Sequence, residues 1–260
     1  MIISGADIDW STSFAAVWRS RSNQLKPVQR FSALPLERLL NMDRQKAALI
    51  HNTERFLHGR PSNHALLWGS RGTGKSALIK SLLYRYHPRG LRMLEVPKDS
   101  LDWLPEISDL VADLPWRFII FCDDLSFAAQ DTRYQGLKPL LEGSLESPPD
   151  NVRIYATSNR RHLLPESMLD NQVSVVAEGG ELHLGDAVEE KIALADRFGL
   201  SLSFYTGNQQ AYLLMVRSYF AGYQGDWAEL EQAACRFARE RGSYSGRTAV
   251  QFYNHLAHTE

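Results

Sequence analysis

The chain has 260 residues, of which 44% are hydrophobic and 23% charged, and its 29 basic and 30 acidic side chains give a net charge of −1. This is the composition of an ordinary globular protein, and the length suits one large domain or a large and a small one. The near-zero charge excludes a bulk positive field that would attract nucleic acid, so any such contact would need a local patch.

The chain has only two cysteines, Cys122 and Cys235, and each lies in a hydrophobic segment. No CxxC or Cys/His spacing surrounds them, which favours buried thiols over a disulfide or a metal pair. The first residues carry Asp7 and Asp9 and no uninterrupted apolar run, so no signal peptide is predicted. The longest apolar run, residues 211–216, is too short to span a bilayer. We therefore expect a soluble cytoplasmic protein without membrane contact.

Residues 1–35 are predicted to form an N-terminal arm, because residues 1–34 are irregular in pattern and rich in Ser and Arg, with breaks at Pro27 and Pro35. From Leu36 to Leu57 apolar residues recur at roughly helical spacing, which predicts a helix that ends before Gly59.

Short apolar runs then alternate with helical patterns. The runs predict five strands, and the segments between them predict helices; the strands are His64–Trp68, Leu91–Val96, Arg117–Cys122, Val152–Thr157 and Leu200–Tyr205, and the helices are Lys75–Tyr86, Leu101–Ala112, Tyr134–Leu145 and Asp186–Phe198. Apolar runs without strict alternation fit strands that are buried on both faces. The pattern predicts an α/β domain with a parallel five-stranded sheet between two layers of helices, over residues 36–206.

The alternation of short apolar runs and helical patterns changes in two places. Residues 173–185 are typical of a small hairpin around Gly179-Gly180. After Thr206 only helical patterns remain, at Asn208–Phe220, Asp226–Arg241 and Gly246–His258. A second, small helical domain is therefore predicted over residues 207–260.

A phosphate-binding loop is predicted at residues 69–76. The sequence Gly69-Ser70-Arg71-Gly72-Thr73-Gly74-Lys75-Ser76 has the pattern GxxxxGK[ST], between a buried-strand pattern and a helical one. Its glycines allow a tight bend that turns several backbone N–H groups toward one anion, and the following helix adds its positive end. Lys75 is expected to reach the outer phosphates and the Ser76 hydroxyl to ligate Mg²⁺. The alternative is a glycine-rich turn, which would match this pattern by chance at a rate on the order of 1%.

Two carboxylates follow the apolar run Phe118–Cys122, at Asp123 and Asp124. In an open parallel sheet the carboxyl end of such a strand lies beside the phosphate loop. Asp123 suits the Mg²⁺ shell, and Asp124 could orient or deprotonate an attacking water. The alternative is a solvated acidic strand end.

Three further features follow in chain order, and together they resemble a known family. Ser158-Asn159 ends the fourth strand, Arg197-Phe198-Gly199 directly precedes the fifth, and Ser245-Gly246-Arg247 opens the last helix. With the phosphate loop and the acidic strand, they resemble the ordered motifs of AAA+ ATPases over residues 36–258. The resemblance implies that Asn159 is the sensor-1 residue, Arg197 an arginine finger that acts on a neighbouring subunit, and Arg247 the sensor-2 arginine of the lid. It also implies that the segment around Met42 packs near the base, and that the protein is a homo-oligomer.

Within that superfamily, segments such as FIIFCDDLSF and YATSNRRHLLPE resemble a bacterial family of ATP-binding proteins of unknown function. The pair Asp123-Asp124 departs from the usual Asp-Glu and is similar to that of the bacterial replication initiators. This shorter side chain puts the efficiency of Asp124 as a base in doubt, though not nucleotide binding. No NKxD segment follows the loop, which favours ATP over GTP.

Several arginines also have a structural interpretation. Arg197 could offset a helix dipole, and Arg247 could be a surface residue. Arg160 and Arg161 could contact a neighbouring subunit or a substrate, or lie in a solvated loop.

The leading hypothesis is an Mg²⁺-dependent ATPase that changes the conformation of an unidentified protein or nucleic-acid partner. A second is a nucleotide-gated protein that loads or recruits another factor with little turnover. A third, a small-molecule kinase, is disfavoured because no substrate-lid insertion is evident while a C-terminal helical lid with Arg247 is.

Overall fold

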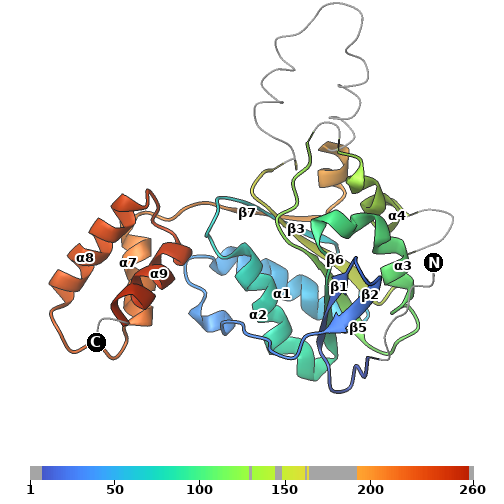
Figure 1. Ribbon diagram of the computed structural model, residues 1–260, viewed down its shortest axis with the longest axis horizontal. Coiled ribbons are helices and arrows are strands. Elements are labelled where there is room, and N and C mark those ends of the chain that lie inside the picture. The colour runs from blue at the N-terminus through green and yellow to red at the C-terminus, as the bar shows by residue number, and fades with distance from the viewer. Residues whose placement is uncertain (1–7, 129–130, 144–147, 162, 164–191, 258–260) are drawn as a thin grey trace, which may run out of the picture.

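The larger domain is built on a seven-stranded sheet with the strand order β2-β1-β4-β5-β6-β3-β7. The computed structural model describes residues 8–128, 131–143, 148–161, 163 and 192–257, and Figure 1 shows the sheet beside a separate group of helices. The strands that were predicted are β3 (Ala65–Gly69), β4 (Leu91–Glu95), β5 (Arg117–Cys122), β6 (Val152–Ser158) and β7 (Leu200–Phe204). They pair in parallel with one another, as the sequence predicts.

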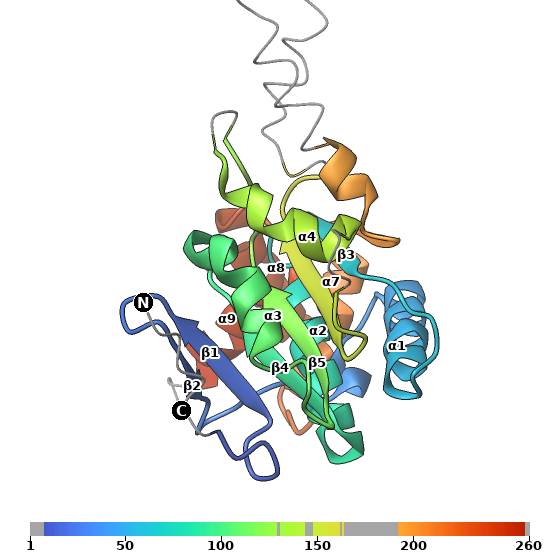
Figure 2. The same ribbon diagram turned by 90° about the vertical axis from the view of Figure 1, so that its right-hand side faces the viewer.

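Helices cover both faces of the sheet and give the domain three layers (Figure 2). Helices α1 (Asp43–Leu57) and α2 (Lys75–Tyr86) pack on the face that carries Leu67, Ile119 and Phe121. Helices α3 (Leu104–Asp109) and α4 (Lys138–Glu142) pack on the opposite face, which carries Leu66, Ile120 and Ile154. Consecutive strand residues point to opposite faces, so a strand covered on both sides is apolar at most positions, as in Phe118–Cys122 of β5.

The N-terminal arm is not irregular, which corrects the sequence prediction. Residues of the arm form β1 (Ala15–Arg19) and β2 (Gln24–Pro27), an antiparallel hairpin whose first strand pairs in parallel with β4. The sheet therefore has seven strands rather than five. Trp18 is fully buried and Leu25 almost so. The strand depends on pairing with β4, a segment more than 70 residues away, which no local pattern indicates.

Two predicted helices are broken by prolines. In the segment predicted as Leu101–Ala112, a 3₁₀ segment, Lys98–Trp103, is followed by α3. In the described part of the segment predicted as Tyr134–Leu145, a 3₁₀ segment, Arg133–Leu137, is followed by α4. A proline lies in the first turn of both α3 and α4. Because proline has no N–H, an α-helix accepts it only there, so each helix restarts at its proline.

The first helix and the segment before β7 also differ in extent from the sequence prediction. Residues 36–57 form a 3₁₀ turn, Leu36–Arg38, and then α1. A further 3₁₀ turn, His87–Arg89, follows α2. Residues 192–196 are helical, whereas the predicted hairpin at 173–185 and the start of the helix at 186 lie outside the described residues.

The C-terminal segment forms the predicted group of helices, α7 (Gln209–Tyr219), α8 (Trp227–Glu240) and α9 (Gly246–Ala257). Asn208 and Asp226 cap α7 and α8 by accepting hydrogen bonds from backbone N–H groups. The helices enclose their own core, which includes Tyr212, Val216 and Phe252. We refer to α7–α9 as the lid; the domain boundary near residue 206 stays a prediction. None of the helices described here is long and apolar enough to cross a membrane.

Candidate nucleotide-binding site

The predicted phosphate loop connects the end of β3 to the start of α2. Gly69, Gly72 and Gly74 have φ angles of +124°, +75° and +95°, a region that side chains with a Cβ rarely adopt. A Cβ on Gly69 would overlap the carbonyl oxygen of Phe204, which accepts a hydrogen bond from the Ser70 N–H at 2.9 Å. The glycines therefore allow the loop to pass close to β7 and to bend into the helix.

Lys75 is the buried cation of this loop, with 7% of its surface exposed. Its Nζ donates hydrogen bonds to the carbonyl oxygens of Gly69 and Ser70, both at 2.8 Å, and to Asn159 Oδ1 at 3.3 Å. Burial lowers the pKa of Lys75, and the negative charges of Asp124 and Asp123 oppose that shift. The ammonium group is thus held at the end of the loop where an anion would lie.

The acidic end of β5 meets the loop, as predicted. Ser76 Oγ donates a hydrogen bond to Asp123 Oδ1 at 2.7 Å, and Asn159 Nδ2 donates one to Asp124 Oδ1 at 2.5 Å. Asn159 therefore bridges Lys75 and Asp124. Asp124 itself has a φ of +53°, in the left-handed region that aspartate tolerates better than most residues. Residues from three separate segments converge on one point.

The donors at this point fit Mg²⁺. The Ser76 hydroxyl and the Asp123 carboxylate are hard oxygen ligands 2.7 Å apart. Mg²⁺ usually keeps several waters and takes only one or two protein ligands beside phosphate oxygens. No group of three or more His, Cys, Asp or Glu side chains among the described residues forms a larger metal site.

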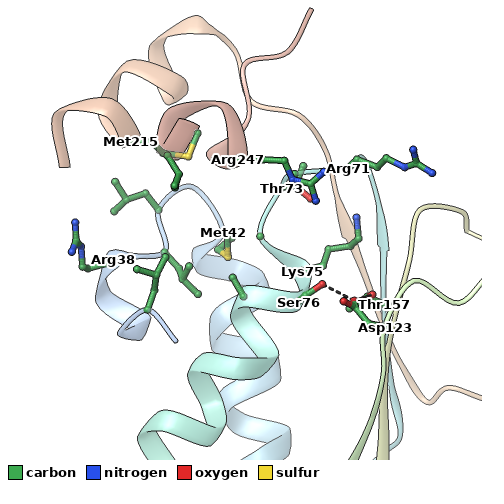
Figure 3. Close-up of a pocket in the computed structure, with 18 of the residues that line it drawn as sticks. Arg38, Met42, Arg71, Thr73, Lys75, Ser76, Asp123, Thr157, Met215 and Arg247 are labelled. Atoms are coloured by element: carbon green, nitrogen blue, oxygen red, sulfur yellow. Dashed lines mark hydrogen bonds between the residues drawn. The ribbon is translucent and has the colours of Figure 1, made fainter. Parts of the chain in front are cut away.

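A cavity of about 600 Å³ opens beside the loop, a size typical of small-molecule sites. At its phosphate end it is lined by the loop from Arg71 to Ser76 and by Asp123, Asp124 and Asn159. At its other end it is lined by residues of the 36–42 segment and of the lid, namely Arg38, Leu39, Leu40, Met42, Met215, Ser218, Tyr219 and Val250. Figure 3 shows Met42 and Met215 on opposite sides of this apolar end.

Met42 packs against the phosphate loop, and its place beside the base stays a prediction. Its methyl carbon would be 2.7 Å from a Cβ on Gly74, so it packs directly against the loop. Arg38 lies over the ring of Tyr219, with its Cζ 5.3 Å from the ring centroid. Arg38, Met215 and Tyr219 were missed in the sequence, because only the fold brings the lid against residues 36–42. Thr157, which donates to Asp123 Oδ1 at 2.5 Å, was also missed, although it stands in β6 two residues before Asn159, which directly follows that strand.

Arg247 lines the cavity from the first turn of α9. Figure 3 shows its side chain directed over Thr73 toward the end of the loop, whereas Arg71 points away from the cavity. The positive charges of Arg247 and Arg71 both contribute to lowering the pKa of Lys75. The lid therefore brings a second cation to the phosphate end of the cavity.

Arg197 does not line this cavity. It directly precedes β7, which runs parallel to β3. It therefore lies at the amino ends of these strands, whereas the phosphate loop lies at the carboxyl end of β3. Its guanidinium forms an ion pair with Glu142 at the end of α4. Arg161 lies over the ring of Trp68, and Arg160 donates its backbone N–H to Ser158 Oγ. Arg197 is thus separated from the site of its own protomer.

Comparison with known proteins supports the fold and defines the family. The structure resembles an arginine-to-alanine variant of RuvB from Thermotoga maritima, with a TM-score of 0.53, 13% identity, and coverage of 85% of this chain and 63% of that chain. An alanine-to-serine variant of the same protein gives a TM-score of 0.52 at 12% identity, over 85% of this chain and 62% of the other. The chain thus spans less than two thirds of the RuvB chains that it resembles.

No curated protein sequence matches the chain. A family model matches residues 11–260, which include the hairpin, the phosphate loop, the acidic strand end and the lid. The chain shares the α/β fold with a helical lid of the RuvB structures, and it belongs to the protein family of unknown function DUF815.

Proposed function

We propose that the protein is an Mg²⁺-dependent ATPase of the AAA+ type, in which ATP hydrolysis changes the conformation of a partner. The observation that carries this proposal is the convergence of Lys75, Ser76, Asp123, Asp124 and Asn159 on one end of a cavity of about 600 Å³. If residues 69–76 were only a glycine-rich turn and Asp123-Asp124 only a solvated strand end, nothing would require these two segments to meet.

The phosphate loop binds the nucleotide. Backbone N–H groups of residues 69–76 and the N-terminus of α2 supply positive dipoles, and Lys75 supplies a full charge. In the described structure Nζ of Lys75 is satisfied by carbonyl oxygens and by Asn159, so phosphate oxygens would compete with these acceptors. Ser76 and Asp123 would hold Mg²⁺, which when bound neutralises charge on the phosphates. Arg247 would add positive charge from the lid.

The base would lie at the apolar end of the cavity, between Met42 and the lid residues Met215 and Tyr219. Aromatic and thioether side chains pack well on a flat heterocycle. This placement makes the bound nucleotide touch the sheet domain and the lid together. Binding would therefore stabilise one arrangement of the two, which is how a nucleotide could control the conformation of a partner.

Asp124 is the proposed base for the attacking water, and Asn159 is the residue that orients it. A carboxylate can accept the proton that water loses as its oxygen bonds to phosphorus. The hydrogen bond from Asn159 Nδ2 holds Asp124 in place at 2.5 Å. The same amide group touches Lys75 through its oxygen, so a phosphate that moved Lys75 would also move Asn159.

Arg197 is proposed to act on the nucleotide of a neighbouring copy. It lies at the opposite edge of the sheet from its own phosphate loop, so within one protomer it has no route to the phosphates. An arginine delivered from a neighbour stabilises the charge that develops during phosphoryl transfer. This assignment requires a homo-oligomer with head-to-tail contacts. We place this oligomer in the cytoplasm, where ATP is abundant and buried thiols such as Cys122 stay reduced.

The alternative is a nucleotide-gated recruitment protein with little turnover. The observation that favours it is Asp124, whose side chain is one methylene shorter than glutamate and already engaged by Asn159. Such a protein would bind ATP through Lys75 and close its lid without efficient use of a base.

Phosphate release separates these functions. The purified protein is incubated with ATP and Mg²⁺, with and without candidate acceptors, and free phosphate and ADP are measured. Release without an acceptor supports the ATPase. Tight binding without release supports the recruitment protein, and a phosphorylated acceptor would support a kinase instead. A protein that binds no ATP in calorimetry would contradict all three.

A further inference from the structure

Thr157 holds both aspartates of the acidic strand end with one hydroxyl group. Its Oγ1 donates a hydrogen bond to Asp123 Oδ1 at 2.5 Å and accepts one from the backbone N–H of Asp124 at 2.9 Å. The side chain projects from β6, the strand next to β5, and only 2% of the residue is exposed. Figure 3 shows Thr157 beside Asp123 below Ser76. Thr157 lies within the family-like segment YATSNRRHLLPE, but the sequence assigns it no role.

Both hydrogen-bonding roles of the hydroxyl are occupied by these two aspartates. A threonine hydroxyl has a single hydrogen, which here goes to a carboxylate, and its oxygen receives an N–H. A hydrogen bond to a charged acceptor is stronger than one between neutral groups. Asp123 Oδ1 therefore receives two hydroxyl donors, Thr157 at 2.5 Å and Ser76 at 2.7 Å. With two donors on Oδ1, the other oxygen, Oδ2, would be the one to bind Mg²⁺ or its waters.

The second bond bears on the backbone of Asp124. Its φ of +53° is uncommon for a residue with a side chain, and such strain persists only where neighbouring groups hold it. The N–H of Asp124 donates to Thr157 Oγ1, and the next N–H, of Leu125, donates to the Thr157 carbonyl oxygen at 2.7 Å. The left-handed turn at Asp124 is thus anchored on both sides by one residue. It directs the carboxylate toward Asn159.

From these contacts we infer that Thr157 is a positioning residue of the site, which orients Asp123 toward Mg²⁺ and holds Asp124 in its left-handed conformation. The inference rests on the proposed function, because it concerns the metal and the base of that reaction. It also explains the aspartate at position 124. Aspartate is one of the few residues with a side chain that occupies the left-handed region readily, whereas glutamate is not among them.

The inference predicts a specific defect in Thr157→Val, which has nearly the same shape but no hydroxyl. The Asp123 carboxylate then loses a donor, and the Asp124 N–H loses its acceptor in a partly buried place. We expect the Mg²⁺ concentration for half-maximal nucleotide binding to rise about 10-fold or more, and kcat to fall about 10- to 100-fold, with KM for ATP at saturating Mg²⁺ changed little. Thr157→Ser keeps the hydroxyl and should restore both values to near those of the wild type.

The experiment titrates Mg²⁺ against a fluorescent ATP analogue, so that one readout does not depend on hydrolysis, and measures phosphate release in parallel. Thr53→Val is the matched control. Thr53 is fully buried and its hydroxyl is also hydrogen-bonded, to the Leu49 carbonyl and Tyr155, but it is outside the cavity. Its loss should lower the melting temperature without moving the Mg²⁺ midpoint.

Two results would overturn the inference. One is a Thr157→Val protein with the Mg²⁺ midpoint and kcat of the wild type, and the other is an equal shift of that midpoint in Thr53→Val. If Thr157→Val does not fold, Thr157→Ser and Thr157→Ala carry the same comparison, with Ser expected to match the wild type and Ala to be defective. A wild-type protein that binds the ATP analogue equally well with and without Mg²⁺ would instead contradict the proposed function, and the inference with it.

Discussion

The backbone N–H of Arg247 donates a hydrogen bond to the carbonyl oxygen of Gly72 at 3.3 Å. This bond joins the first turn of α9 in the lid directly to the phosphate loop. Gly72 also faces Ser245, because a Cβ on this glycine would lie 2.8 Å from Ser245 Oγ and 3.2 Å from the Cβ of Arg247. The lid therefore contacts the loop with no room for a side chain between them, so a shift of one segment requires a shift of the other.

Replacing Gly72 by alanine should disturb this contact and weaken ATP binding. The added methyl group overlaps Ser245 and also forces alanine into a φ of +75°, so the loop or the lid must shift. We expect the Kd for ATP, measured by calorimetry, to rise at least about 10-fold, since a shift of 1.4 kcal/mol is tenfold. Gly242→Ala is the control, because Gly242 has a φ of +62° with nothing within 4 Å of its added Cβ. That variant should lose about 1–2 kcal/mol of stability but bind ATP normally.

Removing the Lys75 ammonium should abolish ATP binding. The change Lys75→Ala removes a charge-assisted contact to phosphate worth about 1.5–3 kcal/mol, and it also removes one donor from each of the carbonyl oxygens of Gly69 and Ser70. Calorimetric titration with ATP measures the effect. Lys80→Ala on the same helix is the control, since Lys80 lies over the ring of Phe121 and does not line the nucleotide cavity. Unchanged affinity in Lys75→Ala would contradict the phosphate loop.

The two aspartates should have separable roles. Asp124→Asn should bind ATP normally but hydrolyse it more slowly, because an amide cannot accept a proton from water. Asp123→Asn should instead require more Mg²⁺ for the same nucleotide affinity, since it loses a charged ligand. Phosphate release and Mg²⁺ titrations of both variants test this. Wild-type hydrolysis in both would mean that the end of β5 is only a solvated acidic tip.

Arg197 should be required in trans. Arg197→Ala should bind ATP normally but hydrolyse it on the order of 10³-fold more slowly, as for other arginine fingers, and wild-type specific activity should rise with protein concentration. A mixture of Arg197→Ala and Lys75→Ala should regain activity, because an intact site then meets an intact finger. Arg217→Ala, which breaks a comparable ion pair with Glu231 in the lid, is the control. A monomer with concentration-independent turnover would leave Arg197 as a partner of Glu142 alone.

His64 should make stability depend on pH. Burial and the positive charge of Arg153 lower its pKa from 6.5 to about 4, and its Nδ1 accepts the Ile154 N–H at 2.9 Å. Between these two values the unfolded chain binds a proton that the folded protein excludes, so the free energy of unfolding falls as the pH falls from 6.5 to about 4. The loss is at most about 3 kcal/mol, because the imidazole keeps some contact with solvent.

Urea unfolding at several pH values measures this dependence. His64→Asn keeps a hydrogen-bond acceptor for the Ile154 N–H but has no group that titrates in this range. Its stability should therefore change less between pH 6.5 and 4.5 than that of the wild type. Parallel curves for the two proteins would show that His64 contributes nothing to the acid sensitivity of the fold.

The parts of the candidate site that a local sequence pattern indicates depend on neighbouring residues. The bend from Gly69 to Ser76 needs glycines at given spacings within eight residues, and the strand Arg117–Cys122 carries its two aspartates directly behind it. The strands of the core were likewise evident, because a strand buried on both faces is apolar at most positions. A parallel sheet then requires the carboxyl ends of its strands to meet at one edge, which places Asp123 beside Lys75 without any further information.

The remainder depends on contacts between distant segments. The hairpin β1–β2 was missed because the four apolar residues of β1 form a strand only by pairing with β4. Arg38 and Tyr219 form one wall of the cavity although 181 positions separate them, and no local pattern relates them. The role inferred for Thr157 depends on the register that sets β6 beside β5. A threonine in a strand pattern does not indicate by itself that its hydroxyl contacts both aspartates. Local rules of backbone conformation and burial thus specify the phosphate loop and the acidic strand end, whereas the base end of the cavity and the support behind the aspartates exist only because packing brings those segments together.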